Sequence, residues 1–213
     1  MAVPANAYGF VVEGPYDVAI LRELIPRILG RDVPVFSRLC LAKVIPNKNL
    51  LTFLRDLQDE MQERLHKKAL KNSQEETEIW RYQKALVIRD SGGKDPKIIE
   101  EELTRKVQER RWAFSHGVHV CIIRQEVETW LLADVAEGVN AVAKKRGGRA
   151  VAEVQGTLED FEYPKERLKQ LLSEAKLQYT EQVCAEIARS LRLDTLSYRC
   201  PSFLTFKQRV VDC

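Results

Sequence analysis

Acidic side chains follow three apolar segments of the sequence, and their spacing could serve metal chemistry. Glu13 comes directly after the run 10–12, Asp90 ends the run "ALVIRD", and Glu126 and Glu128 follow "VHVCII". Carboxylates crowded together repel one another unless a cation lies between them. Magnesium prefers such hard oxygen ligands and keeps waters for substrate phosphates. The expected chemistry is therefore metal-assisted phosphoryl transfer.

The first of these acidic residues belongs to a strand, tight turn and helix unit. Residues 8–13 alternate too little for a half-exposed strand, so the run 10–12 predicts a strand buried on both faces, and Gly14 breaks it. Pro15 suits the first turn of a helix that ends at Gly30. Asp17 then lies in the first helical turn, where the helix dipole alone favours a carboxylate by about 0.3–1 kcal/mol. That structural explanation competes with metal binding for each carboxylate taken singly.

Strand-like and helical patterns alternate through the first two thirds of the chain. Further strands are predicted within 34–45, 84–90 and 117–125, and helices at 47–72, 95–114 and 126–145. Such alternation predicts an α/β fold with a doubly wound, mostly parallel, Rossmann-like sheet, whose strands end at one edge. We expect a core over residues 1–146 with a helical insertion at 46–80. Helical patterns predict a C-terminal extension over 147–213 that packs on this core.

Composition limits the class of protein. The 213 residues fit one elaborated domain, and 34 Lys and Arg against 31 Asp and Glu give a net charge of only +3. Any nucleic-acid surface must therefore be a local patch. Five scattered cysteines without a C-x-x-C pair indicate a reducing compartment. A charged leader and a run of about 20 apolar residues are both missing, so we expect a cytoplasmic protein with no membrane partner.

Several basic side chains could contact a phosphate backbone. The candidates are Lys94, Arg124 and the glycine-containing basic stretch Lys144, Lys145, Arg146 and Arg149. The loop "DSGGKD" could also hold phosphate through its amides, although it lacks P-loop spacing. His116, His119 and Cys121 suggest zinc, but alternate positions of a strand point to different sides.

Two short motifs together resemble a known family. "VVEGPYD" with "VIRDSGG" resembles the paired signature of the TOPRIM domain, in which Glu-Gly follows the first strand and Asp-x-Asp-Gly a later one. "EVETWLLAD" and "YRCPSF" are similar to small stand-alone TOPRIM proteins related to the OLD (overcoming lysogenization defect) family nucleases. The resemblance extends from Phe10 to Phe206.

The resemblance implies roles for the acidic residues. Glu13 would be a metal ligand or general acid/base, Asp17 a supporting acid, and Asp90 a metal ligand. Glu128 would complete the catalytic set.

One position departs from the family pattern. Gly92 replaces the second aspartate of Asp-x-Asp, and either Asp95 or Glu126 could supply the missing metal ligand. Two Mg²⁺ or Mn²⁺ ions would activate a water and stabilise the leaving oxygen, whereas one ion still polarises the phosphate.

The expected function is metal-dependent hydrolysis of phosphodiester bonds, with DNA favoured over RNA. The resemblance implies a hydrolase of phage defence or DNA repair that works beside a separate ATPase, since the chain has no P-loop. The alternative is a non-catalytic TOPRIM module that binds nucleic acid or an ATPase, which Gly92 favours. Homo-oligomerisation stays open.

Overall fold

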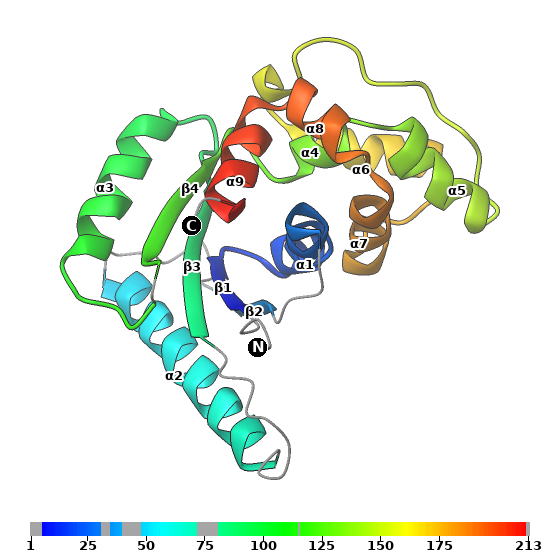
Figure 1. Ribbon diagram of the computed structural model, residues 1–213. Helices are drawn as coiled ribbons and strands as arrows, with labels where there is room; N and C mark the ends of the chain where they lie inside the picture. Colours follow the sequence, from blue (N-terminus) through cyan, green and yellow to red (C-terminus); the bar gives the residue numbers. More distant parts are fainter. Residues whose placement is uncertain (1–5, 31–34, 40–47, 72–80, 115, 212–213) are drawn as a thin grey trace.

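The computed structural model describes residues 6–30, 35–39, 48–71, 81–114 and 116–211 (Figure 1). Its described strands are β1 (Asn6–Val12), β2 (Val35–Leu39), β3 (Arg81–Asp90) and β4 (Val118–Ile123). They form a parallel sheet in the order β2-β1-β3-β4. The α/β class and the parallel sheet are confirmed. The predicted continuation of β2 to residue 45 and the polar stretch 72–80 lie outside the described residues.

The helices cover both faces of the sheet. The helix α1 (Pro15–Leu29) packs on one face, and α2 (Lys48–Lys71) and α3 (Pro96–Gln108) pack on the other (Figure 1). Because β2 and β3 lie on opposite sides of β1, the chain leaves β1 and β3 in opposite directions. Ligands of open α/β sheets bind at such a switch point, outside the carboxyl ends of the strands.

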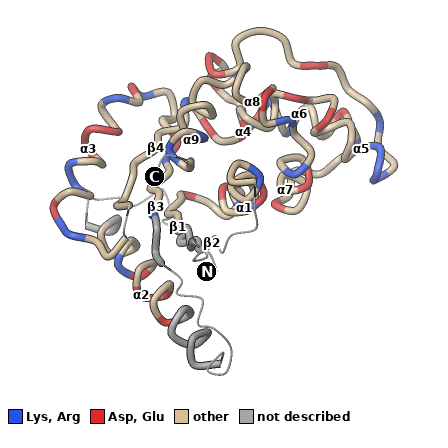
Figure 2. Tube along the Cα trace, in the orientation of Figure 1, with Lys and Arg blue, Asp and Glu red and all other residues tan. Residues whose placement is uncertain are grey.

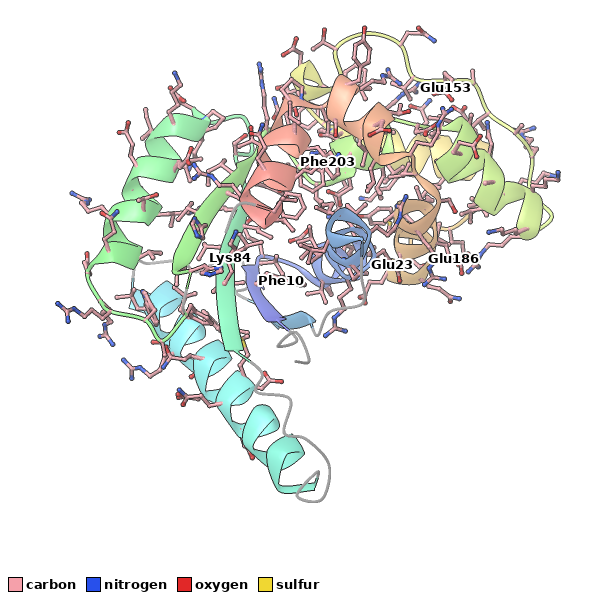
Figure 3. All side chains as sticks on the ribbon, in the orientation of Figure 1. Phe10, Glu23, Lys84, Glu153, Glu186 and Phe203 are labelled. Carbon is pink, nitrogen blue, oxygen red and sulfur yellow. The ribbon has the colours of Figure 1, made fainter. Side chains whose placement is uncertain are left out.

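Alternate residues of β1 enter two different cores, which confirms a strand buried on both faces. Phe10, labelled in Figure 3, and Val12 join the cluster on the α1 side, whereas Val11 packs with α2 and α3. A Cβ atom at Gly9 would lie 2.8 Å from a methyl carbon of Leu57. Glycine at this position therefore lets α2 approach β1 closely.

A helical region follows the sheet. It comprises α4 (Glu128–Leu131), a π-helix η2 (Ala136–Asn140), α5 (Ala141–Lys145), a 3₁₀ turn η3 (Leu158–Asp160), α6 (Pro164–Glu174), α7 (Glu181–Ser190), α8 (Leu193–Arg199) and α9 (Pro201–Val211). Within the described residues, none of the helices has the length and apolar character needed to cross a membrane.

The continuous helix predicted over 126–145 is wrong, because the segment is interrupted after α4. The carboxylate of Asp134, at the interruption, is buried and accepts hydrogen bonds from the guanidinium of Arg192 at 2.8 and 2.9 Å. It also accepts a hydrogen bond from the backbone N–H of Glu137 at 3.4 Å, which starts the next turn. The N–H of Glu137 thus donates to a side-chain oxygen at the interruption.

The helical region shares the larger core with the sheet. Arg27 of α1 donates hydrogen bonds to the carbonyls of Ala188 (2.6 Å) and Leu191 (2.5 Å) at the end of α7. Glu23, labelled in Figure 3, accepts two hydrogen bonds from Arg189. The interface between α1 and α7 therefore holds the helical region against the strand-turn-helix unit.

Candidate functional site

The carboxyl ends of β1, β3 and β4 deliver acidic residues to one cleft. Glu13 follows β1, Asp90 is the last residue of β3, and Glu126 lies three residues beyond β4. All three line a cleft of about 670 Å³, together with Asp95. We call it the acidic cleft. It lies at the switch point between β1 and β3, where the fold favours a ligand site.

The pKa of Asp90 responds to the acidic residues around it. Burial raises its pKa well above the ordinary value, and the charges of Asp17, Glu128, Glu13 and Glu126 raise this pKa further. The other predicted catalytic residues therefore all contribute to the electrostatic potential at Asp90. We call these five side chains the carboxylate cluster. Its excess negative charge is the condition that a bound cation relieves.

Two members of the cluster also have structural partners. Glu13 pairs with Arg89, with 2.9 Å between Oε1 and Nε, although burial keeps its pKa above the ordinary value. Asp17 accepts a hydrogen bond at 2.8 Å from the backbone N–H of Gly14 and so caps α1. The helix-terminus explanation is thus valid for Asp17. Its carboxylate also interacts electrostatically with Glu128 and Glu13.

The two acidic residues after β4 contact α6 and the segment beyond it. Glu126 accepts a hydrogen bond at 3.0 Å from the backbone N–H of Lys165, and the Lys165 Nζ atom lies 3.6 Å from Glu128 Oε1. Glu128 is buried, and the hydroxyl of Tyr179 donates to Oε1 at 2.5 Å. Lys165 and Tyr179 were missed by the sequence analysis.

An aromatic pair supports this side of the cluster. The rings of Tyr16 and Tyr179 stack, with their centroids 4.5 Å apart. The ammonium group of Lys165 lies 5.5 Å from the Tyr16 centroid and 5.7 Å from that of Tyr179. Both distances fall within the range of cation–π attraction, so the rings help to fix Lys165. The sequence did offer one signal of this aromatic pair, because Tyr16 lies directly next to Asp17 in the first turn of α1.

The chemistry of the donor set fits Mg²⁺ or Mn²⁺, since every member of the cluster offers carboxylate oxygens. As the side chains lie, no three acidic, histidine or cysteine residues of the described ranges are close enough to hold one ion. Internal partners engage four of the five carboxylates. A cation bound through Oε1 of Glu13 would compete with Arg89 for that oxygen.

The loop after β3 explains the departure from the Asp-x-Asp pattern. Gly92 has a φ of 54°, and Gly93 has a φ of 81°. Glycine adopts this left-handed region without strain, so the tight turn favours it at position 92. Asp95 lines the acidic cleft but also caps α3, accepting a hydrogen bond at 2.9 Å from the N–H of Lys97. Only its second oxygen is left for a cation.

The predicted basic residues fall into two separate places. Lys94 and Arg124 lie beside the loop that follows β3. The stretch 144–149 lies at the end of α5, across the helical region from β4 (Figure 2). There Arg146 pairs with Glu186 through two hydrogen bonds, and Arg149 donates to the carbonyl of Glu174. Lys144 and Lys145 are exposed.

The bond between Tyr179 and Glu128 predicts a stability difference between two tyrosines. Tyr179→Phe should cost about 1–3 kcal/mol of unfolding free energy, because it leaves a buried carboxylate short of a donor. Tyr163→Phe is the matched control, since the Tyr163 hydroxyl also donates to a glutamate, Glu162, at 2.9 Å but in an exposed position. Urea unfolding measures both. Equal losses would contradict the structural importance assigned to Glu128.

The raised pKa values predict an unusual dependence of stability on pH. Burial and neighbouring carboxylates raise the pKa of Asp17 to about 7, so the native state binds more protons than the unfolded state between pH 4 and 7. Stability from this group is therefore lost as the pH rises through that window. In chelator, the melting temperature of wild type minus that of Asp17→Asn should fall up to about pH 7 and then level off. A difference that rises with pH would contradict the assignment.

Comparison with known proteins adds a family but no activity. No curated protein and no solved structure shows significant similarity to this chain. The family described as "Domain of unknown function (DUF4276)" matches residues 12–210, which include the whole carboxylate cluster. This chain therefore belongs to the DUF4276 family.

Proposed function

We propose that the protein hydrolyses phosphodiester bonds in nucleic acid with the help of Mg²⁺ or Mn²⁺. The observation that carries the proposal is that carboxylates from the ends of β1, β3 and β4 line one cleft at the switch point of a parallel sheet. Glu13, Asp90 and Glu128 would hold the ion, with Glu126 or Asp95 as the further ligand in place of Gly92. A divalent ion bound there would polarise the phosphodiester. The resemblance to TOPRIM nucleases supports the same chemistry.

The protein's own groups would assist in distinct ways. Lys165 lies within reach of Glu128 and next to Glu126, so its ammonium can neutralise charge on a phosphate that enters the cluster. Arg89 is partly exposed in the acidic cleft and could transfer from Glu13 to a phosphate oxygen. Asp17, whose raised pKa is about 7, can hold a proton next to the reacting groups at neutral pH.

A second candidate is a module without catalysis that binds nucleic acid or a separate ATPase. Two observations favour it: glycine occupies the position of the second Asp-x-Asp carboxylate, and Arg89 already neutralises Glu13. In such a module the acidic residues would serve only structure. The two candidates differ in how they respond to metal.

Purified protein incubated with plasmid, single-stranded DNA and RNA tests the proposal. We expect cleavage of at least one substrate with Mg²⁺ or Mn²⁺ and none with chelator. If tight binding occurs without cleavage under any of these conditions, the module replaces the hydrolase. The assay should be repeated with a separate ATPase added, since the resemblance implies such a partner.

A further inference from the structure

A second hollow lies on the other side of the loop that follows β3. Its volume is about 260 Å³, and Lys94, Arg124 and Gly93 are among its lining residues. The acidic cleft and this hollow share Ser91, Lys94 and Asp95, so the loop 91–95 forms the ridge between them. We call the second hollow the basic hollow. The two hollows are therefore adjacent.

The basic hollow offers donors that are not fully used. Within the described part of the chain, Lys94 takes part in no ion pair, and the N–H of Gly93 donates no hydrogen bond. Arg124 pairs with Asp160 at 2.8 Å, but both side chains are more than half exposed. An exposed pair of this kind contributes little, so a phosphate can compete for Arg124.

The ridge that presents these donors is held by its own hydrogen bonds. Ser91 donates its N–H to the carbonyl of Ile123 at 2.9 Å, and its hydroxyl accepts from the N–H of Gln125 at 2.9 Å. Gly92 donates to the carbonyl of Gln125 at 3.1 Å. The loop after β3 is thus fastened to the segment after β4, which carries Arg124. These hydrogen bonds hold Lys94 and Arg124 on the lining of the same hollow.

We propose that the basic hollow binds the phosphate next to the one that is cleaved. A single strand of nucleic acid would cross the ridge with its scissile phosphate in the acidic cleft and its neighbour between Lys94, Arg124 and the Gly93 amide. The inference rests on the proposed function and adds the position of the strand. It also assigns strand binding to Lys94 and Arg124 rather than to the stretch 144–149, where Arg146 and Arg149 have internal partners.

Binding of a fluorescent 12-nucleotide single strand in Ca²⁺ tests the assignment without depending on cleavage. The variant Lys94→Ala/Arg124→Ala is compared with Lys144→Ala/Lys145→Ala, which removes the same charge from exposed positions. We expect the first variant to lose about tenfold in affinity and about 0.7 in the slope of log K against log salt, and the second to bind like wild type. All four side chains are exposed, so melting temperatures should stay unchanged.

Other outcomes separate this inference from the proposed function. Equal binding by the two double variants, or no binding by wild type, would overturn the basic hollow as a strand site. If the selective loss appears while no metal supports cleavage, the hollow stands and only hydrolysis is withdrawn. Inorganic phosphate is the second probe. If it protects wild type from thermal unfolding while the strand shows no preference, the hollow binds free phosphate and the strand proposal is wrong.

Discussion

Replacing Asp90 by asparagine should lower metal-dependent cleavage at least about 100-fold, which corresponds to about 2.7 kcal/mol of lost transition-state stabilisation. Asp90 ends β3 at the switch point and feels the charge of every other member of the carboxylate cluster. Asparagine keeps the shape of the side chain but removes the anionic oxygen that a hard cation prefers. Cleavage rates at saturating Mn²⁺, measured on the best substrate of the panel, give the comparison.

The same substitution should leave the metal-free protein as stable as wild type or more so. The raised pKa of Asp90 means that its ionised form is disfavoured in the native state, because burial removes its solvation and the surrounding acids repel it. A neutral side chain removes that repulsion. Glu102→Gln is the matched control, since Glu102 lines the acidic cleft without belonging to the cluster. An active Asp90→Asn, or a control that fails equally, would refute the assignment.

Local patterns were sufficient to predict the strands and the residues at their ends. Val11 and its neighbours form a short apolar run without alternation, and both of their faces are buried. Once four such runs alternate with helices, parallel strands follow, and their carboxyl ends must meet at one edge. The gathering of Glu13, Asp90 and Glu126 is therefore a consequence of topology that sequence reasoning can reach.

The partners of these acids depend on contacts between distant segments. Lys165 meets Glu126 across 39 residues, and Tyr179 meets Glu128 across 51. Neither the spacing nor the composition of the sequence shows which later helix closes over the sheet. The basic stretch at 144–149 illustrates the same limit. Its charges were visible, but Glu186, which accepts two hydrogen bonds from Arg146, could not be identified as its partner.

The helical period of the sequence also failed to predict the interruption after α4, where every side chain is buried. The segment from Val127 to Val135 is buried throughout, so its apolar residues contain no stripe that distinguishes a continuous helix from an interrupted one. Trp130, within this segment, is fully buried in the core. This residue connects the short helix that carries Glu128 to the last helix of the chain.

Trp130→Ala should produce the largest loss of stability, about 3–5 kcal/mol. The indole is fully buried, its centroid lies 5.1 Å from that of Phe203 and 5.2 Å from that of Phe206, and its N–H donates to the hydroxyl of Ser202 at 3.1 Å. Truncation would leave a cavity between α4 and α9 and an unpaired hydroxyl. At about 2–4 °C per kcal/mol, the melting temperature should fall by roughly 10 °C.

The loss should also reach the carboxylate cluster, because Glu128 lies two residues away on the same four-residue helix. A helix this short has no stability of its own and keeps its place only through packing. Tyr198→Ala is the control, since Tyr198 is 89% exposed in α8 and its removal should change stability by less than about 0.5 kcal/mol. Calorimetry with and without Mn²⁺ separates the two effects. Trp130→Ala should lower the melting temperature and reduce the stabilisation by metal, whereas full metal stabilisation of a destabilised variant would show that α9 does not position Glu128.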